Sequence, residues 1–96
     1  MRLADYVIQF LESKKINTVF TVSGGGSIFL CDALYKSKKI DYIPCHHEQA
    51  VSFATESYSR VKNKPGAAIV TTGPGGTNCS TGVACCWIDS VPALFI

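Results

Sequence analysis

Hydrophobic residues recur along this chain with two different periods, one typical of helices and the other of short buried strands. A stripe of Leu3, Val7, Phe10 and Leu11 at helical spacing predicts an amphipathic helix that ends near Lys15. A segment rich in valine, phenylalanine and threonine predicts a strand at residues 17–22, and further short segments predict strands at residues 40–43, 67–71 and 91–96. The third of these is almost wholly apolar, as strands buried on both faces of a parallel sheet are.

Helical patterns also occupy the gaps between the predicted strands. The helical period restarts at Ile28 after the first strand, and helices are expected at residues 47–61 and 77–87. The side of the 47–61 helix expected to be buried carries Ala50, Val51, Ala54, Tyr58 and Val61. The corresponding side of the 77–87 helix carries Cys79, Val83, Cys86 and Trp87. Residues 73–76, with the sequence Gly-Pro-Gly-Gly, are expected to form a break before the last helix.

This alternation predicts the fold class. Strand, tight loop and helix follow one another repeatedly, which indicates an α/β fold with a three-layer parallel sheet and right-handed crossovers. With 96 residues the chain makes at most one small domain, assigned to residues 1–96. The last apolar segment reaches Ile96 with no crossover after it. We therefore expect residues 1–96 to be the N-terminal part of a domain, truncated after about four strands.

Composition narrows the range of partners and compartments. A net charge of +2 is too small to favour nucleic acid or an anionic membrane as a partner. No apolar run approaches the length of about 18 residues that a transmembrane helix needs. The five cysteines are an odd number without the spacing of a disulfide framework. Free thiols fit a reducing compartment, so we expect a cytoplasmic protein.

Three loops are expected to meet at one edge of the sheet. Residues 23–27, 45–48 and 72–78 each follow a predicted strand, and ligands of open parallel sheets bind at the carboxyl ends of the strands. Glycines in two of these loops allow close approach of a ligand to the backbone, and helix N-termini behind the loops direct N–H groups at it. Each loop taken singly is better explained as an ordinary structural turn.

Two other kinds of site find little support in the sequence. The dinucleotide fingerprint Gly-x-Gly-x-x-Gly ends in Phe29 when it starts at Gly24, and in Asn78 when it starts at Gly73. Both matches fail, so a nucleotide-binding domain is disfavoured. The run Cys-His-His-Glu at residues 45–48 offers adjacent donors that cannot all face one ion without strain, so no metal site is expected in this chain.

Taken together, the motifs resemble a known family. In order and spacing, the chain is similar throughout to the N-terminal, pyrimidine-binding domain of thiamine-diphosphate enzymes of the acetolactate synthase type. The resemblance is carried by His-Glu-Gln at 47–49, Tyr-Ser-Arg at 58–60, Lys-Pro-Gly at 64–66, Thr-Thr-Gly-Pro-Gly-Gly-Thr-Asn at 71–78 and Asp-Ser-Val-Pro at 89–92. Any one of these motifs is weak evidence, but five in register are specific.

The resemblance implies a role for individual residues. Glu48 is expected to be the catalytic carboxylate, which contacts a ring nitrogen of the cofactor and shares a proton with it. A dry pocket is expected to raise the pKa of Glu48 and so to make this sharing possible. The residues expected to bind thiamine diphosphate are Gly24, Gly25, Gly26, His47, Glu48, Gly73, Pro74, Gly75 and Asn78.

The resemblance also implies cofactors and partners. The enzyme is expected to decarboxylate a 2-keto acid such as pyruvate and to act as a carboligase, that is, a lyase or transferase. Mg²⁺ is expected to bind a C-terminal domain that is absent from this chain. A middle domain that binds FAD is possible in this family and is neither expected nor excluded. A homodimer or higher homo-oligomer is implied, and the small residues Ala50, Ala54, Ser57 and Ala84 suit either its interface or the core. The chain alone is expected to be inactive.

Two alternatives stay open at this point. One is a truncated, non-catalytic paralogue that acts as an assembly module. The other is a carboligase that acts on a keto sugar in surface-polysaccharide synthesis. The latter is suggested by departures from the common family pattern, among them Ser23 where many relatives have proline and Ala50 where glycine is usual.

Overall fold

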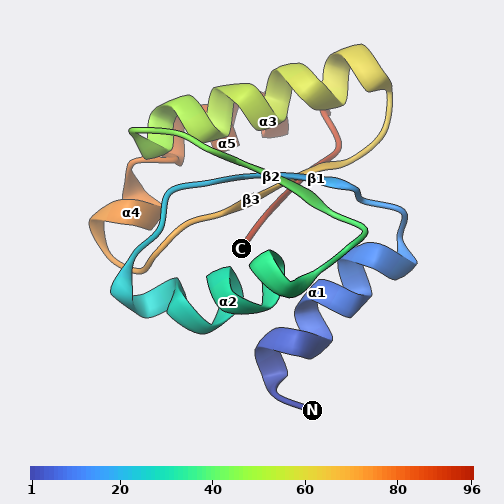
Figure 1. Cartoon of the computed structure of the whole chain (residues 1–96). Helices are drawn as coiled ribbons and strands as arrows, with labels where there is room; N and C mark the ends of the chain where they lie inside the picture. Colours follow the sequence, from blue (N-terminus) through green and yellow to red (C-terminus); the bar gives the residue numbers. More distant parts are fainter.

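The computed structural model describes all 96 residues, which form a four-stranded sheet between two layers of helices (Figure 1). The strands are β1 (Thr18–Thr21), β2 (Asp41–Pro44), β3 (Gly66–Ile69) and β4 (Ala93–Phe95). The helices are α1 (Leu3–Ser13), α2 (Ile28–Lys36), α3 (Glu48–Lys62), α4 (Pro74–Thr77) and α5 (Ser80–Ile88), with a short 3₁₀ turn, η1 (Gly25–Ser27). Helices α1 and α2 lie on one face of the sheet, and α3 and α5 lie on the other.

All strands are parallel, in the order β2-β1-β3-β4. The predicted α/β fold with a parallel sheet is therefore confirmed. From β1 the chain crosses to β2 through α2, and it then returns over β1 through α3 to reach β3 on the other side. The helices that follow β1 and β3 consequently lie on opposite faces. The gap between the ends of β1 and β3 is the switch point at which ligands of such sheets bind.

Two hydrophobic clusters hold the layers together. The larger cluster lies between the sheet and helices α1 and α2. Its buried members are Ala4, Ile8, Leu11, Ile16, Val19, Ala33, Leu34, Ile40, Ala67 and Ile69. The smaller cluster lies on the α3 face and has three buried members, Phe20, Val51 and Ala68. Strand β3 is buried along its whole length, as its apolar sequence predicted.

The predicted buried face of α1 is wrong in part. Leu11 is buried as expected, but Leu3 is 79% exposed and Phe10 is 42% exposed. The helix instead buries Ala4 and Ile8, which follow the same helical spacing one position further along the chain. Apolar residues cover about half of the circumference of this helix, so the sequence pattern alone could not show which side faces the sheet.

The predicted face of α3 is also only partly right. Val51 is buried, whereas Val61 is 83% exposed and Ala50 lies at the surface. The remaining buried positions of this helix are hydroxyl residues, namely Ser52, Thr55 and Ser59. Each hydroxyl is paired with the backbone: Ser52 and Thr55 donate to the carbonyls of Gln49 and Val51, and Ser59 accepts from the N–H of Gly66. Hydroxyls satisfied in this way can be buried at little cost, which a hydrophobicity pattern does not register.

The region after β3 departs most from expectation. Residues 77–87 do not form one helix, because Pro74–Thr77 is itself a helical turn and the longer helix restarts at Ser80. Proline at the first helical position lacks only an N–H that would be unpaired there, so it starts this turn where a break was predicted. In α5, Cys86 is buried, but Trp87 is 85% exposed. None of these helices is both long and apolar enough to cross a membrane.

Candidate functional site

The three loops predicted to converge do lie at one edge of the sheet, around the ends of β1, β2 and β3 (Figure 1, left). Parallel pairing continues past β2, since the N–H of Cys45 donates to the carbonyl of Thr21 at 2.8 Å. The buried hydroxyl of Thr21 donates in turn to the carbonyl of Ile69 at 2.7 Å and joins the ends of β1 and β3. Above this bridge, the N–H of Gly26 donates to Oγ1 of Thr71 at 3.1 Å.

Glu48 stands at the N-terminus of α3. His47 is the N-cap residue of this helix, with extended backbone, and its Nδ1 accepts the N–H of Gln49 at 3.0 Å. A negative charge in the first turn also interacts favourably with the helix dipole. The Glu48 side chain is half-buried, and the Nδ2 amide of Asn78 donates to its Oε2 at 3.2 Å. Behind it, the buried thiol of Cys79 donates to the backbone carbonyl of Glu48 at 3.5 Å.

The direction of the pKa shift of Glu48 differs from expectation. Its pKa lies below the ordinary glutamate value because the carboxylate is hydrogen-bonded first by its own backbone and then by the Asn78 amide. The nearby His47 ring lowers the pKa further, while partial desolvation acts in the opposite direction. The raised pKa expected from a dry pocket is therefore wrong for this chain by itself. The half-exposed carboxylate is not desolvated enough to outweigh its hydrogen bonds.

The glycines of the site divide into two kinds. A Cβ added to Gly24 would lie 2.5 Å from Cβ of Thr71, and one added to Gly75 would lie 2.7 Å from Cγ2 of the same threonine. These two glycines are therefore required by close packing. A Cβ at Gly25 or Gly73 would meet no atom within 4 Å, although the φ of +67° at Gly73 favours glycine in any case. The open positions leave bare backbone facing outward.

The structure thus brings together some of the predicted site residues more closely than others. Gly75 and Asn78 approach the carboxylate of Glu48 directly, with Oε1 lying 3.7 Å from a Cβ built on Gly75. Gly24 and Gly26 contact Thr71 rather than Glu48. The three residues Gly25, Gly73 and Pro74 lie exposed on the open side of the loops, and His47 is turned toward its own helix.

Two residues at the centre of this arrangement were not predicted. The sequence pattern predicts Thr71 at the end of a strand, but its side chain lies between the two glycine loops. Its position directly before a glycine-rich loop at a sheet edge was the one available signal. Cys79 was assigned to the core, and the structure confirms that it is buried, but its contact with Glu48 depends on the break between α4 and α5.

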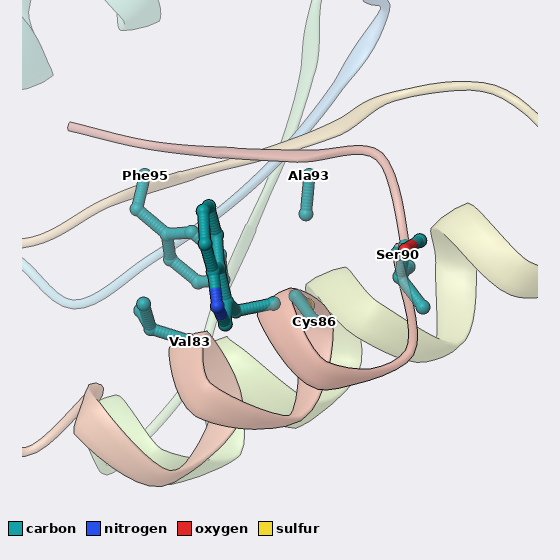
Figure 2. A pocket seen from close by; sticks show the side chains of 7 residues that line it. Val83, Cys86, Ser90, Ala93 and Phe95 are labelled. Atoms are coloured by element: carbon teal, nitrogen blue, oxygen red, sulfur yellow. The ribbon is translucent and has the colours of Figure 1, made fainter.

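The cavities of the chain lie away from this edge. One of about 390 Å³ lies between α5 and β4, where Val83 and Cys86 face Ala93 and Phe95 (Figure 2). Another, of about 220 Å³, lies between α2 and β2 and reaches the candidate loops only at Ser23 and Cys45. None of the five cavities is lined by Glu48 or by a glycine of the candidate loops. Among the candidate residues Gly25, Gly73, Pro74 and Asn78 are exposed, Gly24 and Glu48 are partly buried, and Gly75 is buried.

Comparison with known proteins supplies the remaining evidence. The family model described as "Thiamine pyrophosphate enzyme, N-terminal TPP binding domain" matches residues 1–96. The chain is 42% identical over 93 residues to the chloroplastic acetolactate synthase of Arabidopsis thaliana, covering 97% of this chain and 14% of that protein. It is 38% identical over 96 residues to the large subunit of acetolactate synthase isozyme 2 of Escherichia coli, covering 100% of this chain and 17% of that protein.

The acetolactate synthase of Mycobacterium leprae is 37% identical over 93 residues, which are 97% of this chain and 15% of that protein. The chain thus spans about one seventh to one sixth of the length of these relatives. The match of the family model over every residue, together with a parallel α/β sheet, establishes that this chain belongs to the thiamine pyrophosphate enzyme family and corresponds to its N-terminal TPP binding domain.

Proposed function

We propose that this chain binds the aminopyrimidine ring of thiamine diphosphate, with Glu48 as the residue that holds and transfers a proton at a ring nitrogen. The enzyme to which it contributes decarboxylates a 2-keto acid such as pyruvate and joins the product to a second carbonyl compound. The observation that carries this proposal is the position of the Glu48 carboxylate, held by Asn78 beside Gly75 at the switch point of the sheet.

The residues present fit a flat heterocycle. A planar ring needs surfaces free of side chains on which to lie, and the backbone at Gly25 and Gly73 offers open space of this kind. Oε2 of Glu48 is occupied by the Asn78 amide, and Oε1 is directed toward Gly75 on the side of the glycine loops. A ring N–H at this oxygen would make a charge-assisted hydrogen bond.

Glu48 also has the properties of a proton carrier. When bound, the cofactor supplies a carbon acid that becomes a nucleophile and afterwards stores the electrons released by decarboxylation. The lowered pKa of Glu48 in the open chain favours its carboxylate form but makes this carboxylate a weaker proton acceptor. Covering this half-exposed group with an apolar surface removes water from it and raises its pKa, so that the proton can then be shared rather than held outright.

The other half of the site is assigned to a partner. No group of three or more His, Cys, Asp or Glu side chains in this chain could hold a metal ion. We propose that Mg²⁺ and the diphosphate are bound by another domain, from a second copy in a homodimer or larger oligomer. Three of the small residues considered for such an interface, Ala50, Ser57 and Ala84, are exposed here rather than packed in the core. Their exposure supports a close partner on the α3–α5 face.

The proposal extends to the acceptor, the flavin and the compartment of the whole protein. The acceptor is a second keto acid or, as the departures at Ser23 and Ala50 suggest, a keto sugar. Whether FAD belongs to the complete enzyme depends on residues outside this domain. The five free cysteines fit a reducing compartment such as the cytoplasm.

The test is the Glu48→Gln substitution in the full-length protein. If that protein has no diphosphate-binding domain, the domain is added as a separate polypeptide. Exchange of the thiazolium proton of bound cofactor with deuterium is measured by NMR. We expect a slowing of about 10²- to 10⁴-fold, because the glutamine cannot take up the proton. Glu56→Gln, on the same helix but paired with Arg60, is the matched control and should exchange at the wild-type rate.

Exchange that is equally fast in the Glu48→Gln protein would refute the assigned role. A wild-type protein that binds the complementary domain but never accelerates exchange would instead identify a non-catalytic assembly module.

A further inference from the structure

We infer that Thr71 is a positioning residue that sets the separation of the two glycine loops and thereby the fit of the pyrimidine ring beside Glu48. This inference rests on the function proposed above and adds to it a residue whose side chain is not itself assigned a contact with the cofactor. Thr71 lies two positions beyond β3, where the chain leaves the sheet toward α4.

One hydrogen bond ties the first glycine loop to the rest of the site. Within residues 23–27, Ser27 bonds to Gly24 and to Cys31, both inside the same loop and helix. The bond from Gly26 N–H to Oγ1 of Thr71 is the only one that reaches from this loop to a different segment of the chain. The acceptor on Thr71 is therefore the one hydrogen-bond tie between this loop and the loop after β3, and it acts beside a close approach of Gly26 to Oγ1 of Thr72, which would lie 2.7 Å from an added Cβ.

Close packing against both sides of Thr71 also fixes the separation of the two glycine loops. Gly24 approaches Thr71 so closely that an added Cβ would lie 2.5 Å from its Cβ, 2.6 Å from Cγ2 and 2.8 Å from Oγ1. Gly75 approaches from the opposite loop, with its added Cβ 2.7 Å from Cγ2. Thr71 is thus a spacer between a loop that carries Gly24 and a helical turn that borders Glu48.

The hydrogen bonds that hold Glu48 do not involve Thr71. The Glu48 carboxylate and carbonyl are held by Asn78 and Cys79, which both follow α4. Loss of the Thr71 acceptor should therefore loosen the first glycine loop and leave Glu48 in place. A loosened loop weakens binding of the ring but does not remove the proton carrier, so cofactor affinity should fall while turnover at saturating cofactor is retained.

The first test compares Thr71→Val with Thr71→Ser in the complete enzyme. Valine keeps the volume but has no acceptor, whereas serine keeps the acceptor. We expect the cofactor concentration for half-maximal activity to rise roughly five- to tenfold in Thr71→Val, with kcat at saturation within about twofold of wild type. Thr71→Ser should recover most of the affinity. Thr81→Val, an exposed threonine of α5, controls for the substitution itself.

Hydrogen exchange provides a readout that does not involve the reaction. The Gly26 amide should exchange slowly in the wild type and in Thr71→Ser, and at least tenfold faster in Thr71→Val, because its acceptor is lost. Equal protection of this amide in all three proteins, or equal half-saturation in Thr71→Val and Thr71→Ser, would overturn the inference.

A second pair of variants tests the packing role even if Thr71→Val fails to fold. Gly75→Ala should weaken cofactor binding through its contact with Cγ2, and Thr71→Ser should relieve that loss because it removes Cγ2. Absence of relief in the double variant counts against the spacer. Failure of the proposed function is distinguishable: Glu48→Gln would then leave thiazolium exchange unaltered, while the Gly26 amide would still respond to Thr71→Val.

Discussion

The two faces of the sheet are packed by different kinds of side chain. On the α1–α2 face, ten buried apolar residues form one continuous cluster that includes Leu11, Leu34 and Ile69. On the α3–α5 face, three buried apolar residues form a cluster, and the buried positions of α3 other than Val51 are hydroxyl residues such as Thr55 and Ser59. Burial of apolar area therefore stabilises the first face. The second face depends on small side chains and on hydroxyl groups whose hydrogen bonds are satisfied.

The consequence is a difference in how closely the helices approach. Helix α5 lies against α3 at Gly82, where an added Cβ would be 2.2 Å from Oγ of Ser52. This contact brings the start of α5, and with it Cys79, against the backbone of Glu48. The same face leaves Trp87 and Val61 largely exposed. The first face thus mainly stabilises the fold, and the second face positions the proposed catalytic carboxylate of Glu48.

The largest expected effect is a loss of stability on the first face. Leu34→Ala removes a fully buried side chain and leaves a cavity in the larger cluster, which should lower the free energy of unfolding by about 2–5 kcal/mol. Leu3→Ala on the same face is the control, since Leu3 is exposed, and should change it by less than about 0.5 kcal/mol. Urea unfolding followed by circular dichroism measures both. A similar cost for the two leucines would contradict the observed face of α1.

A smaller effect is expected from overpacking the second face. Gly82→Ala forces its new Cβ into Ser52 and should destabilise the protein by about 1–3 kcal/mol. Because α5 must shift, the contact between Cys79 and Glu48 should loosen as well. Ser52→Gly removes the two nearest atoms and should restore part of the stability in the double variant. Additive losses in thermal unfolding would show that the contact does not set the spacing of these helices.

The smallest effect concerns the acid stability of the first face. Hydrogen bonds from Arg2 hold the pKa of Asp5 below the ordinary value of 3.8. The pKa of Asp32 is lowered in the same way, first by a hydrogen bond from Lys36 and then by one from Arg2. Since the folded pKa is depressed, this stabilisation is present above about pH 4 and is lost as the pH falls further. Arg2→Gln should flatten the dependence of unfolding midpoint on pH between about 4 and 2.

Lys14→Gln is the control for this experiment, because Lys14 lies over the Phe10 ring rather than beside these carboxyls. An unaltered acid slope in Arg2→Gln would mean that the ion pairs at this surface are too well solvated to matter.

Several features of the molecule could be read from the sequence because they depend on local chemistry. Every strand and most helices were predicted within a few residues, since apolar β-branched runs and glycine or proline breaks act over short distances. The parallel sheet followed from the order of these elements, and the convergence of three loops followed from the parallel sheet. The position of Glu48 at the start of a helix, beside a glycine-rich loop, could also be predicted because it depends on local sequence.

Only the tertiary structure decided which sides of the helices are buried, what Thr71 contacts and what Asn78 adds to the pKa shift of Glu48. Ser52, Thr55 and Ser59 are buried because backbone groups pair with their hydroxyls, and no hydrophobicity pattern contains that information. The pKa of Glu48 is lowered first by its own backbone N–H, which is a local effect, but also by the Asn78 amide, which reaches it only in the folded chain. Local sequence determines conformation along the chain, whereas side-chain environments arise from residues that meet only after the chain has folded.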